Sequence, residues 1–381
     1  MAIITSTHTA IRHSKPDAVY TILKERIAQG YWKIGEQLPV ENTLAGELQC
    51  SRSTIALAVG RLVHDGVLER RPRTGTRVLR MEPQRLATSV GLQQKPALAL
   101  DACAYIYPSA QHEGVWRIAS GFQERANHAG RQAVMLSMGT NFRREAEAVG
   151  RLAEFDVKGA VLFPVILTPQ DHDYYTRMVL SCPFPVVFVE INLPGSQRPA
   201  VVVDGFHAGR AMTRHLLGKG LRKIGFLANY AWTSIARDKH LGYRETMLDA
   251  GIENHADWTQ RDMEMRPDYD NPLTNPTEIA RRYLKAHPDV EGVVCSHDYL
   301  ALGLLRAAQE TGRRVPEDLL VTGMDDFALG ATASTPLTTY RVPYETIGAR
   351  AFEILSGLLS GQQPGTPETQ VRGEIVLRTS A

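Results

Sequence analysis

The sequence has little cysteine and lacks any hydrophobic run long enough to cross a membrane. Its four cysteines, Cys50, Cys103, Cys182 and Cys295, stand far apart, with no paired spacing and no histidine placed beside them as a metal ligand. We therefore expect free thiols, no metal site and no cofactor. The longest apolar runs, such as residues 159–167, contain proline and are far shorter than a membrane span.

Enzyme signatures are also missing. The Gly-Lys-Gly at residues 218–220 lacks the pattern of a phosphate-binding loop, and the histidines are scattered, with no nucleophile elbow and no HExxH motif. Asp325 and Asp326 form an acidic pair, for which capping and ligand bonding are simpler explanations than acid–base catalysis. The sequence therefore predicts a protein that is not an enzyme. A cytoplasmic sugar-acting enzyme is the competing function that we keep as an alternative.

The composition is that of a water-soluble protein with more than one domain. The chain has 381 residues, 43% of them hydrophobic and 22% charged, which is enough to bury cores in two or three domains. Its first residues are mixed and polar, without the basic and apolar regions of a signal peptide. We expect a cytoplasmic protein without a membrane partner, which argues against a second alternative, a transport-type binding protein without transcriptional output.

Positive charge gathers at the start of the chain. Residues 1–80 contain 12 Lys and Arg against 7 Asp and Glu, whereas the remaining residues contain 31 against 34. A small excess of this kind is common by chance. Its position nevertheless agrees with a polyanionic partner for the first part of the chain only.

Helical periodicity predicts three helices in this basic part, at residues 16–30, 41–49 and 51–66. Ser51 is a natural N-cap for the third helix, because its hydroxyl can accept a bond from an unpaired amide. The apolar stripe of that helix leaves Arg52, Ser53 and Thr54 near a positively polarised helix start, where they can bond phosphate oxygens or base edges.

Two short strands are predicted after the third helix, at residues 67–70 and 76–79, joined by a basic turn that ends at Gly75. Such a hairpin beside such a helix has the form of a wing that contacts a minor groove or the DNA backbone. On spacing alone, an amphipathic helix with a solvated Arg-rich turn and no partner explains the same residues equally well.

Residues 15–80 resemble the GntR-type winged helix-turn-helix domain. The resemblance rests on "AQGYWKIGEQLPVENTLAGELQCSRSTIALAVGRLVHDGVLERRPRTGTRV", which keeps the glycine and proline positions of that family. It implies sequence-specific binding to double-stranded operator DNA, with the helix from Ser51 in the major groove and the wing at the minor groove. The DNA contacts that it implies are Glu41, Arg52, Ser53, Thr54, Arg73, Thr74, Gly75 and Thr76.

Val40 departs from the N-capping Ser that many members of the family have there, and Ala56-Leu57 stand where a further Arg is often found. The polar, proline-flanked residues 81–96 are most simply a linker. We therefore expect a DNA-binding domain at residues 1–80, a linker at 81–96 and a ligand-binding domain at 97–381.

After the linker, short apolar runs alternate with amphipathic helical stretches. The runs "ALALDA", "AVMLSM", "GAVLFP", "PVVFVEI", "KIGFLA", "GVVCS" and "LLVTGMD" are strand-like. Continuous apolar strands that alternate with helices indicate an α/β fold with parallel sheets covered on both faces. Ligands of such sheets bind beyond the carboxyl ends of the strands.

Polar and aromatic side chains follow these runs. Acidic groups and a guanidinium can bond pairs of hydroxyls, and aromatic faces can stack on a sugar ring, although helix capping explains some of the acids as well. The post-strand residues that we single out as candidate ligand contacts are Tyr105, Tyr107, Glu190, Trp232, Arg237, His297 and Asp325.

Residues 97–381 resemble the periplasmic-binding-protein-like effector domain of LacI/GalR regulators. The resemblance rests on "VVVDGFHAGRAMTRHLLGKGLRKIGFLA", "SIARDKHLGYRETMLDAGI", "VEGVVCSHDYLALGLLRAAQETGRRVPEDLLVTGMDDF" and "TPLTTYRVPYETIGARAFEIL". It implies a two-lobed fold with ligand contacts at Glu190, Arg237, His297 and Asp325. His297 departs from the family's usual Asn and introduces a ring whose charge can change near neutral pH.

A GntR-type domain on a LacI/GalR-type domain resembles the arabinose-responsive AraR-type repressors. This resemblance implies a ligand-responsive transcription regulator, a repressor, whose effector is a sugar. By the same resemblance, ligand in the cleft changes how two effector domains pack in a homodimer and thereby changes operator affinity.

Overall fold

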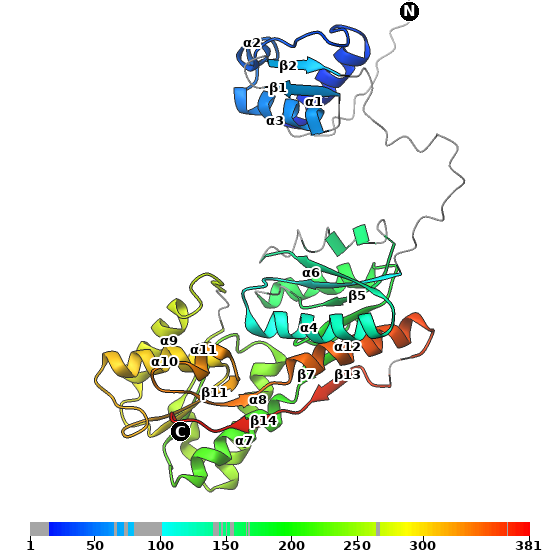
Figure 1. Ribbon diagram of the computed structural model, residues 1–381. Coiled ribbons are helices and arrows are strands. Elements are labelled where there is room, and N and C mark those ends of the chain that lie inside the picture. Colours follow the sequence, from blue (N-terminus) through cyan, green and yellow to red (C-terminus); the bar gives the residue numbers. More distant parts are fainter. Residues whose placement is uncertain are drawn as a thin grey trace, which may run out of the picture. The chain divides into compact units, whose positions relative to one another are not determined.

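The computed structural model describes residues 15–64, 67–71, 75–79 and 101–139, and residues 145–381 with short gaps before 168, at 264–266 and at 364. The chain forms two compact units, Met1–Ala97 and Leu98–Ala381 (Figure 1). The linker that we expect at residues 81–96 lies outside the described residues and stays a prediction.

Three helices and one hairpin make up the N-terminal unit. They are α1 (Lys15–Ala28), α2 (Glu41–Glu47), α3 (Arg52–His64), β1 (Leu68–Arg71) and β2 (Gly75–Val78). Ser51 caps α3 as its sequence predicts, since its Oγ accepts the Thr54 N–H at 3.2 Å. Leu23, Ile55 and Leu62 are fully buried between the helices, so burial of their apolar faces is what joins α1 and α3.

The hairpin is antiparallel, with Arg70 opposite Thr76. A third segment extends it: the Leu38 N–H donates to the Thr76 carbonyl at 2.8 Å. Val40, the N-cap of α2, makes no side-chain capping bond, as its departure from the usual Ser predicts. The start of α2 therefore lies beside the hairpin and brings Glu41 near β1.

The C-terminal unit contains two six-stranded sheets, one in each of two lobes. The first sheet has the order β13-β7-β6-β5-β3-β4 and the second the order β14-β12-β11-β10-β8-β9. All pairs are parallel except β12 with β14. The strands are β3 (Ala102–Tyr107), β4 (Gln132–Ser137), β5 (Val157–Leu162), β6 (Val186–Val189), β7 (Ala200–Val203), β8 (Ile224–Ala228), β9 (Thr259–Arg261), β10 (Gly292–Cys295), β11 (Leu320–Asp325), β12 (Thr338–Arg341), β13 (Glu368–Val371) and β14 (Glu374–Val376).

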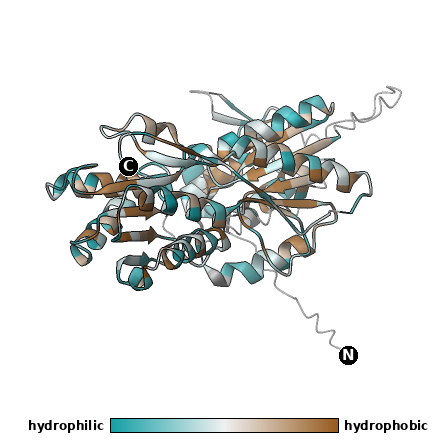
Figure 2. Ribbon diagram, turned by 90° about the horizontal axis from the view of Figure 1, so that it is seen from below, coloured by the Kyte–Doolittle hydropathy of each residue, from teal (hydrophilic) through white to brown (hydrophobic). Residues whose placement is uncertain are grey.

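Helices cover the faces of both sheets, with hydrophobic strands inside and mixed helix surfaces outside (Figure 2). The helices are α4 (Glu113–His128), α6 (Pro169–Leu180), α7 (Gly205–Gly218), α8 (Ser234–Asp249), α9 (Thr274–Ala286), α10 (Asp298–Glu310), α11 (Ala328–Ala331) and α12 (Tyr344–Leu359), with the 3-10 helix η2 (Glu253–Trp258). Helices α4 and α12 approach closely, because a Cβ on Gly121 would lie 1.9 Å from the Glu345 carbonyl oxygen. The start of α4 lies beside the second lobe, where Glu113 Oε2 accepts the Ala328 N–H at 2.8 Å.

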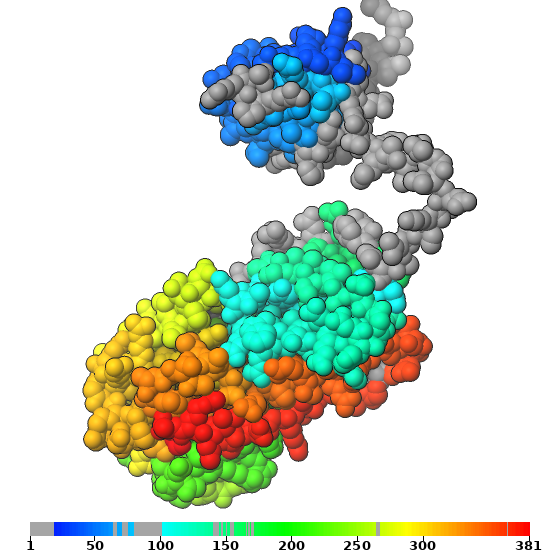
Figure 3. Space-filling model, in the orientation of Figure 1, coloured from blue at the N-terminus to red at the C-terminus, as the bar shows by residue number. Residues whose placement is uncertain are grey.

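The chain passes between the two sheets at residues 203–205, 341–344 and 371–374. As a result, the last strands of the chain are shared between the lobes, and the C-terminal segment, red in Figure 3, runs along the face of the unit. Connections of this kind between two lobes are the places at which hinge motions of two-lobed proteins occur.

The first predicted strand, residues 97–102, is wrong at its C-terminal end. Asp101 has a positive φ of +39°, and β3 begins only at Ala102, while residues 97–100 lie outside the described part. Tyr105 and Tyr107 are therefore inside a strand, not beyond one. The other six predicted strands are confirmed in position within two residues at each end. β7, β9, β12, β13 and β14 were not predicted, and most of them are short.

Within the described part of the chain, no helix is long and apolar enough to cross a membrane.

Candidate functional site

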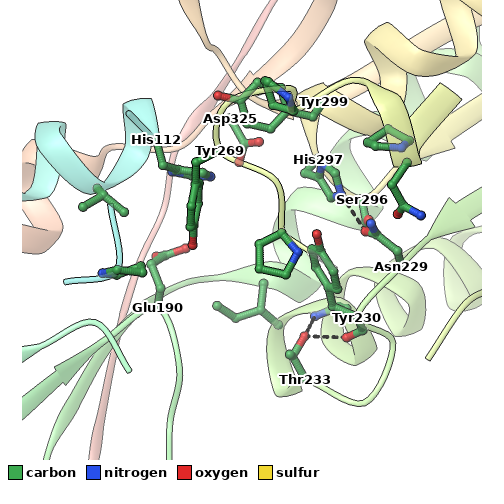
Figure 4. Close-up of a pocket in the computed structure, with 18 of the residues that line it drawn as sticks. His112, Glu190, Asn229, Tyr230, Thr233, Tyr269, Ser296, His297, Tyr299 and Asp325 are labelled. Atoms are coloured by element: carbon green, nitrogen blue, oxygen red, sulfur yellow. Dashed lines mark hydrogen bonds between the residues drawn. The ribbon is translucent and has the colours of Figure 1, made fainter. Parts of the chain in front are cut away.

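A cavity of about 210 Å³ lies between the two lobes of the C-terminal unit. Its wall combines residues that follow β6, β8 and β10, the last residue of β11, and residues from the start of α4 (Figure 4). The carboxyl ends of strands from both sheets thus meet at one place, as the α/β pattern predicts. The polar and aromatic members of this wall include His112, Glu190, Asn229, Tyr230, Lys239, Tyr269, Ser296, His297, Tyr299 and Asp325.

Glu190 follows β6 and has a positive φ of +64°, while its N–H donates to the Val201 carbonyl at 3.0 Å. Its Oε1 is buried and has no hydrogen-bond partner. Burial raises the pKa of this carboxyl to about 7, although the charge of Lys239 acts in the opposite direction. Glu190 therefore offers the cavity a polar group that is still unsatisfied.

Lys239 supplies positive charge to the same wall. Its side chain is buried, and its Nζ donates to the Ser296 carbonyl at 2.8 Å. Asp325 is also buried; it accepts the Asp298 N–H at 3.0 Å and the Tyr344 hydroxyl at 2.7 Å. Burial raises the pKa of Asp325, and Lys239 lowers it. The ammonium thus compensates carboxyl groups from both lobes, Glu190 and Asp325.

His297 precedes α10 and uses both ring nitrogens within the protein. Nδ1 accepts the Leu300 N–H at 3.2 Å, so Nε2 carries the proton and donates it to Asn229 Oδ1 at 2.6 Å (Figure 4). Tyr230 stacks on the ring at 5.9 Å. Burial, with the charges of Lys239 and His112, lowers the pKa of His297 to about 3. The expectation that its charge changes near neutral pH is wrong, because protonation would also break the helix cap.

Aromatic rings close the wall beside His112. The His112 ring meets Tyr269, Tyr299 and Phe327 edge to face, with centroid distances of 5.3–6.3 Å. Burial lowers the pKa of His112 to about 4. Within the described residues, four members of the cavity wall carry a buried polar atom that has no hydrogen-bond partner: His112 Nδ1, Glu190 Oε1, Asn229 Nδ2 and Ser296 Oγ. Because unpaired buried polar atoms are costly, this set suits a ligand with several hydroxyl groups and apolar ring faces.

The seven candidate ligand contacts separate into two groups. Glu190, His297 and Asp325 line the cavity, whereas Tyr105, Tyr107, Trp232 and Arg237 are not part of its wall. Tyr105 is fully buried under α4, with its hydroxyl bonded to the Val115 carbonyl at 3.3 Å. Tyr107 stacks on Tyr105, and Trp232 packs against the core of the first lobe. The Arg237 side chain is 68% exposed and lies 3.7 Å from the Asp238 carboxylate.

Sequence reasoning missed Lys239, Asn229 and His112. Lys239 stands two residues after Arg237 on α8, on the same helix face as the buried Ala236 and Tyr243. Ala236, Lys239 and Tyr243 are spaced by three and four residues, the spacing of one helix face. This spacing could have indicated from the sequence that Lys239 lies on the buried face of the helix. Asn229 directly follows β8, so the rule that selected the other post-strand residues also applies to it.

The residues expected to contact DNA are partly described. Arg52, Ser53 and Gly75 are exposed, and Thr54 and Thr76 are half-buried. Glu41 forms ion pairs with Arg52 (Nε to Oε2, 3.3 Å) and with Arg70. Arg73 and Thr74, which the resemblance assigns to the wing, lie outside the described residues. Helix α3 and the hairpin therefore present a basic, hydroxyl-bearing surface in the N-terminal unit.

All four cysteines are free. In the part of the chain that the structure describes, no cluster of three or more His, Cys, Asp or Glu side chains could hold a metal ion.

Two family models match the chain, one for each unit. "Bacterial regulatory proteins, gntR family" matches residues 15–78, and "Periplasmic binding protein-like domain" matches residues 213–381. The arabinose metabolism transcriptional repressor of Geobacillus stearothermophilus is 25% identical over 365 residues, which cover 93% of this chain and 94% of the repressor. The chain is a transcription regulator.

The regulator also resembles solved structures in fold. A transcriptional regulator CelR in complex with cellobiose has a TM-score of 0.64 at 22% identity, over 90% of this chain and 100% of CelR. A Lac repressor dimer bound to operator and an anti-inducer has a TM-score of 0.61 at 20% identity, over 74% and 93% of the two chains. The predicted fusion of a GntR-type domain with a LacI/GalR-type domain, and its fold class, are confirmed.

The pH dependence of the regulator should reflect its buried histidines. The His297 ring is expected to stay neutral between pH 8 and pH 5, because its pKa in the folded protein is about 3. The unfolded ring takes up a proton near pH 6.5, so His297 makes the free energy of unfolding fall as the pH drops below about 6.5. ¹⁵N NMR of histidine-labelled protein, with His297→Asn to assign the resonance, checks the charge. A ring that titrates near pH 6.5 would contradict the geometry.

Proposed function

We propose that this regulator is a repressor whose effector is an uncharged sugar bound in the cavity between the lobes. The observation that carries the proposal is the wall of four unpartnered polar atoms, beside Tyr230, Tyr269 and Tyr299. Sugar hydroxyls can donate to Glu190 Oε1 and accept from Asn229 Nδ2, and aromatic rings pack on the C–H faces of the sugar.

The charges in the cavity favour an uncharged ligand. Among the described lining residues, Lys239 is the one cation; its charge already acts on Glu190 and Asp325, and its Nζ donates to the Ser296 carbonyl. A phosphate or carboxylate on the ligand would have to compete with these two buried carboxyl groups for one ammonium. The similar proteins agree with a sugar, since one is named for arabinose metabolism and another is a cellobiose complex.

Signalling between the cavity and the DNA would use the two-lobed hinge. Contacts between the lobes already form around the cavity: Glu113 Oε2 accepts the Ala328 N–H at 2.8 Å, and Gln111 Nε2 donates to Asp270 Oδ1 at 3.1 Å. A sugar that bonds groups of both lobes stabilises the closed arrangement through its greater affinity for that state. Closure then changes how two effector domains pack and so changes operator affinity, with a typical coupling of about 1–3 kcal/mol.

A thermal-shift screen of the purified regulator tests the sugar. The panel contains neutral pentoses, hexoses and short oligosaccharides, with uronic acids and sugar phosphates for comparison. A ligand that binds only the folded state stabilises it by about 2.7 kcal/mol at 100 times its dissociation constant. We expect at least one neutral sugar to raise the melting temperature and to change operator affinity. Stabilisation by sugar phosphates alone would contradict the proposal.

We also propose that the regulator acts as a homodimer; the operator-bound Lac repressor, which it resembles in fold, is itself a dimer. A groove on the second lobe suits a copy of the same chain. It is lined by apolar Leu302, Leu305 and Leu329 and by Arg306, Arg314 and Glu317. Apolar residues with charges of both signs at their edge allow the self-complementary contact of a twofold dimer.

The substitution Leu329→Lys is expected to shift the regulator to monomer at micromolar concentration. Leu329 is 44% exposed and lines the groove, so the substitution leaves the fold of one chain intact while adding one positive charge to each side of the proposed interface. Light scattering coupled to gel filtration measures the mass. Leu377→Lys, at a 65% exposed leucine outside the groove, is the control and should remain dimeric. Equal masses for both variants would exclude the groove as the interface.

A further inference from the structure

The DNA-binding unit contains an acidic side chain in the middle of its basic surface. Glu41, the first residue of α2, reaches Arg52 at the start of α3 through Oε2, and Arg70 in β1 through Oε1. The Glu41 side chain is 18% exposed, whereas those of Arg52 and Arg70 are 70% and 54% exposed. One carboxylate thus connects the start of α3 to strand β1 of the hairpin.

A direct contact between the Glu41 carboxylate and a DNA phosphate is electrostatically unfavourable, because both groups are negatively charged. Both of its oxygens already accept bonds from guanidinium groups, which leaves it less able to accept from a base. The arginines keep other donors: Arg52 uses its Nε towards Glu41, and Arg70 uses Nη2. The remaining N–H groups of both side chains stay available on the exposed surface.

We propose that Glu41, which the resemblance to the GntR-type domain implies as a DNA contact, is instead a positioning residue for DNA recognition: it fixes the separation between Arg52 and Arg70 and does not itself contact DNA. The inference rests on the proposed binding of operator DNA by this unit. Long arginine side chains lose rotamer freedom when they bind, and a carboxylate that holds both of them in advance reduces that loss. The benefit applies only to a DNA sequence that places its acceptors at the matching separation.

Removing the charge of Glu41 should therefore have opposite effects on two kinds of DNA. In Glu41→Gln the surface gains one net positive charge, so binding to non-specific duplex becomes tighter and more dependent on salt. Binding to the operator becomes weaker, because Arg52 and Arg70 are no longer held at the right separation. We expect the ratio of operator to non-specific affinity to fall by about tenfold, within the range measured for residues that specify bases.

Selection from a random duplex library with the full-length wild-type chain first supplies an operator. Affinities for that operator and for a scrambled duplex are then measured at several salt concentrations for wild type, Glu41→Gln and Glu47→Gln. Glu47 is the matched control, because it lies on the same helix and, among the residues that the structure describes, its ion-pair partner is Arg26, at 3.5 Å. Glu47→Gln should raise both affinities together and leave their ratio unchanged.

Two further variants separate positioning from direct contact and from misfolding. Glu41→Asp keeps the charge but is one methylene shorter, so it should lower operator affinity without raising non-specific affinity. In an Arg70→Ala background, Glu41→Gln should cost much less operator affinity than in wild type, because one of the two groups that Glu41 positions is gone. Circular dichroism and thermal unfolding confirm that each variant is folded.

The outcomes of these measurements test the positioning role of Glu41 separately from operator binding, the function on which that role rests. An unchanged affinity ratio in Glu41→Gln, or a full loss that persists in Arg70→Ala, would overturn the positioning role; the second result indicates a direct contact with a base. If the wild-type chain enriches no sequence, operator binding itself is wrong and the positioning role falls with it.

Discussion

Lys239→Met is expected to lower the free energy of unfolding of the effector domain by roughly 3–5 kcal/mol, the usual cost of removing one partner from a set of buried charges. Lys239 is 5% exposed and faces the buried carboxyl groups of Glu190 and Asp325. Methionine has a similar length and leaves these carboxyl groups without a cation. The same variant should no longer be stabilised by any sugar that stabilises the wild type.

The cost of Lys239→Met should depend on pH in a defined direction. The pKa of Glu190 is already raised to about 7. Loss of the ammonium raises the pKa further, so in the variant the carboxyl group takes up a proton below this higher pKa and avoids the unpaired charge. The difference in unfolding free energy between wild type and variant should therefore be larger at pH 8 than at pH 6. Denaturant unfolding of the full chain, followed by tryptophan fluorescence, measures it.

Arg237→Met is the matched control for Lys239→Met, two residues earlier on α8. Since the Arg237 side chain is 68% exposed and outside the cavity wall, its loss should change stability by at most about 0.5 kcal/mol. Sugar binding should change little as well. If Arg237→Met abolishes sugar binding while Lys239→Met retains it, the cavity described above is not the effector site.

Arg52→Ala is expected to remove operator recognition while leaving the effector response intact. Arg52 is the first residue of α3, and its side chain is 70% exposed. If this guanidinium contacts a base edge, truncation costs about 1–3 kcal/mol of discrimination at one base pair, whereas a phosphate contact would weaken all sequences alike. Binding to the selected operator and to single-base variants of it distinguishes the two.

The control for Arg52→Ala is Arg26→Ala, on α1 of the same domain. Arg26 pairs with Glu47 through a contact of 3.5 Å and is not one of the residues expected at the DNA. Its loss should lower the affinity for all DNA slightly and equally, through net charge alone. A loss of specificity in Arg26→Ala equal to that in Arg52→Ala would place the recognition surface elsewhere.

Local patterns in the sequence determined the elements and the class of the protein. Ser51 marked the start of α3 because a hydroxyl before a helix has an unpaired amide to bond, and this is a local interaction. Continuous apolar runs marked six strands of the two sheets, because strands covered on both faces exclude polar residues. The same runs placed Glu190 and His297 after strands, where the cavity forms, and Asp325 at the strand end, where it is the last residue of β11.

Tertiary structure decided which charged groups surround each side chain of the cavity, and therefore its protonation state. Arg237 and Lys239 are two residues apart on α8, and the helical period indicates only which of them points inward. The folded structure decides that the buried Lys239 acts on the carboxyl groups of Glu190 and Asp325, while Arg237 stays exposed. His297 looked like a group that titrates near neutral pH, but its bonds to Asn229 and Leu300 and its burial keep it neutral. The pairing of Glu41 with Arg52 and Arg70 joins three elements, and no sequence spacing encodes it. Burial, charge pairing and hydrogen bonding depend on residues distant in the chain, so they follow from the folded structure.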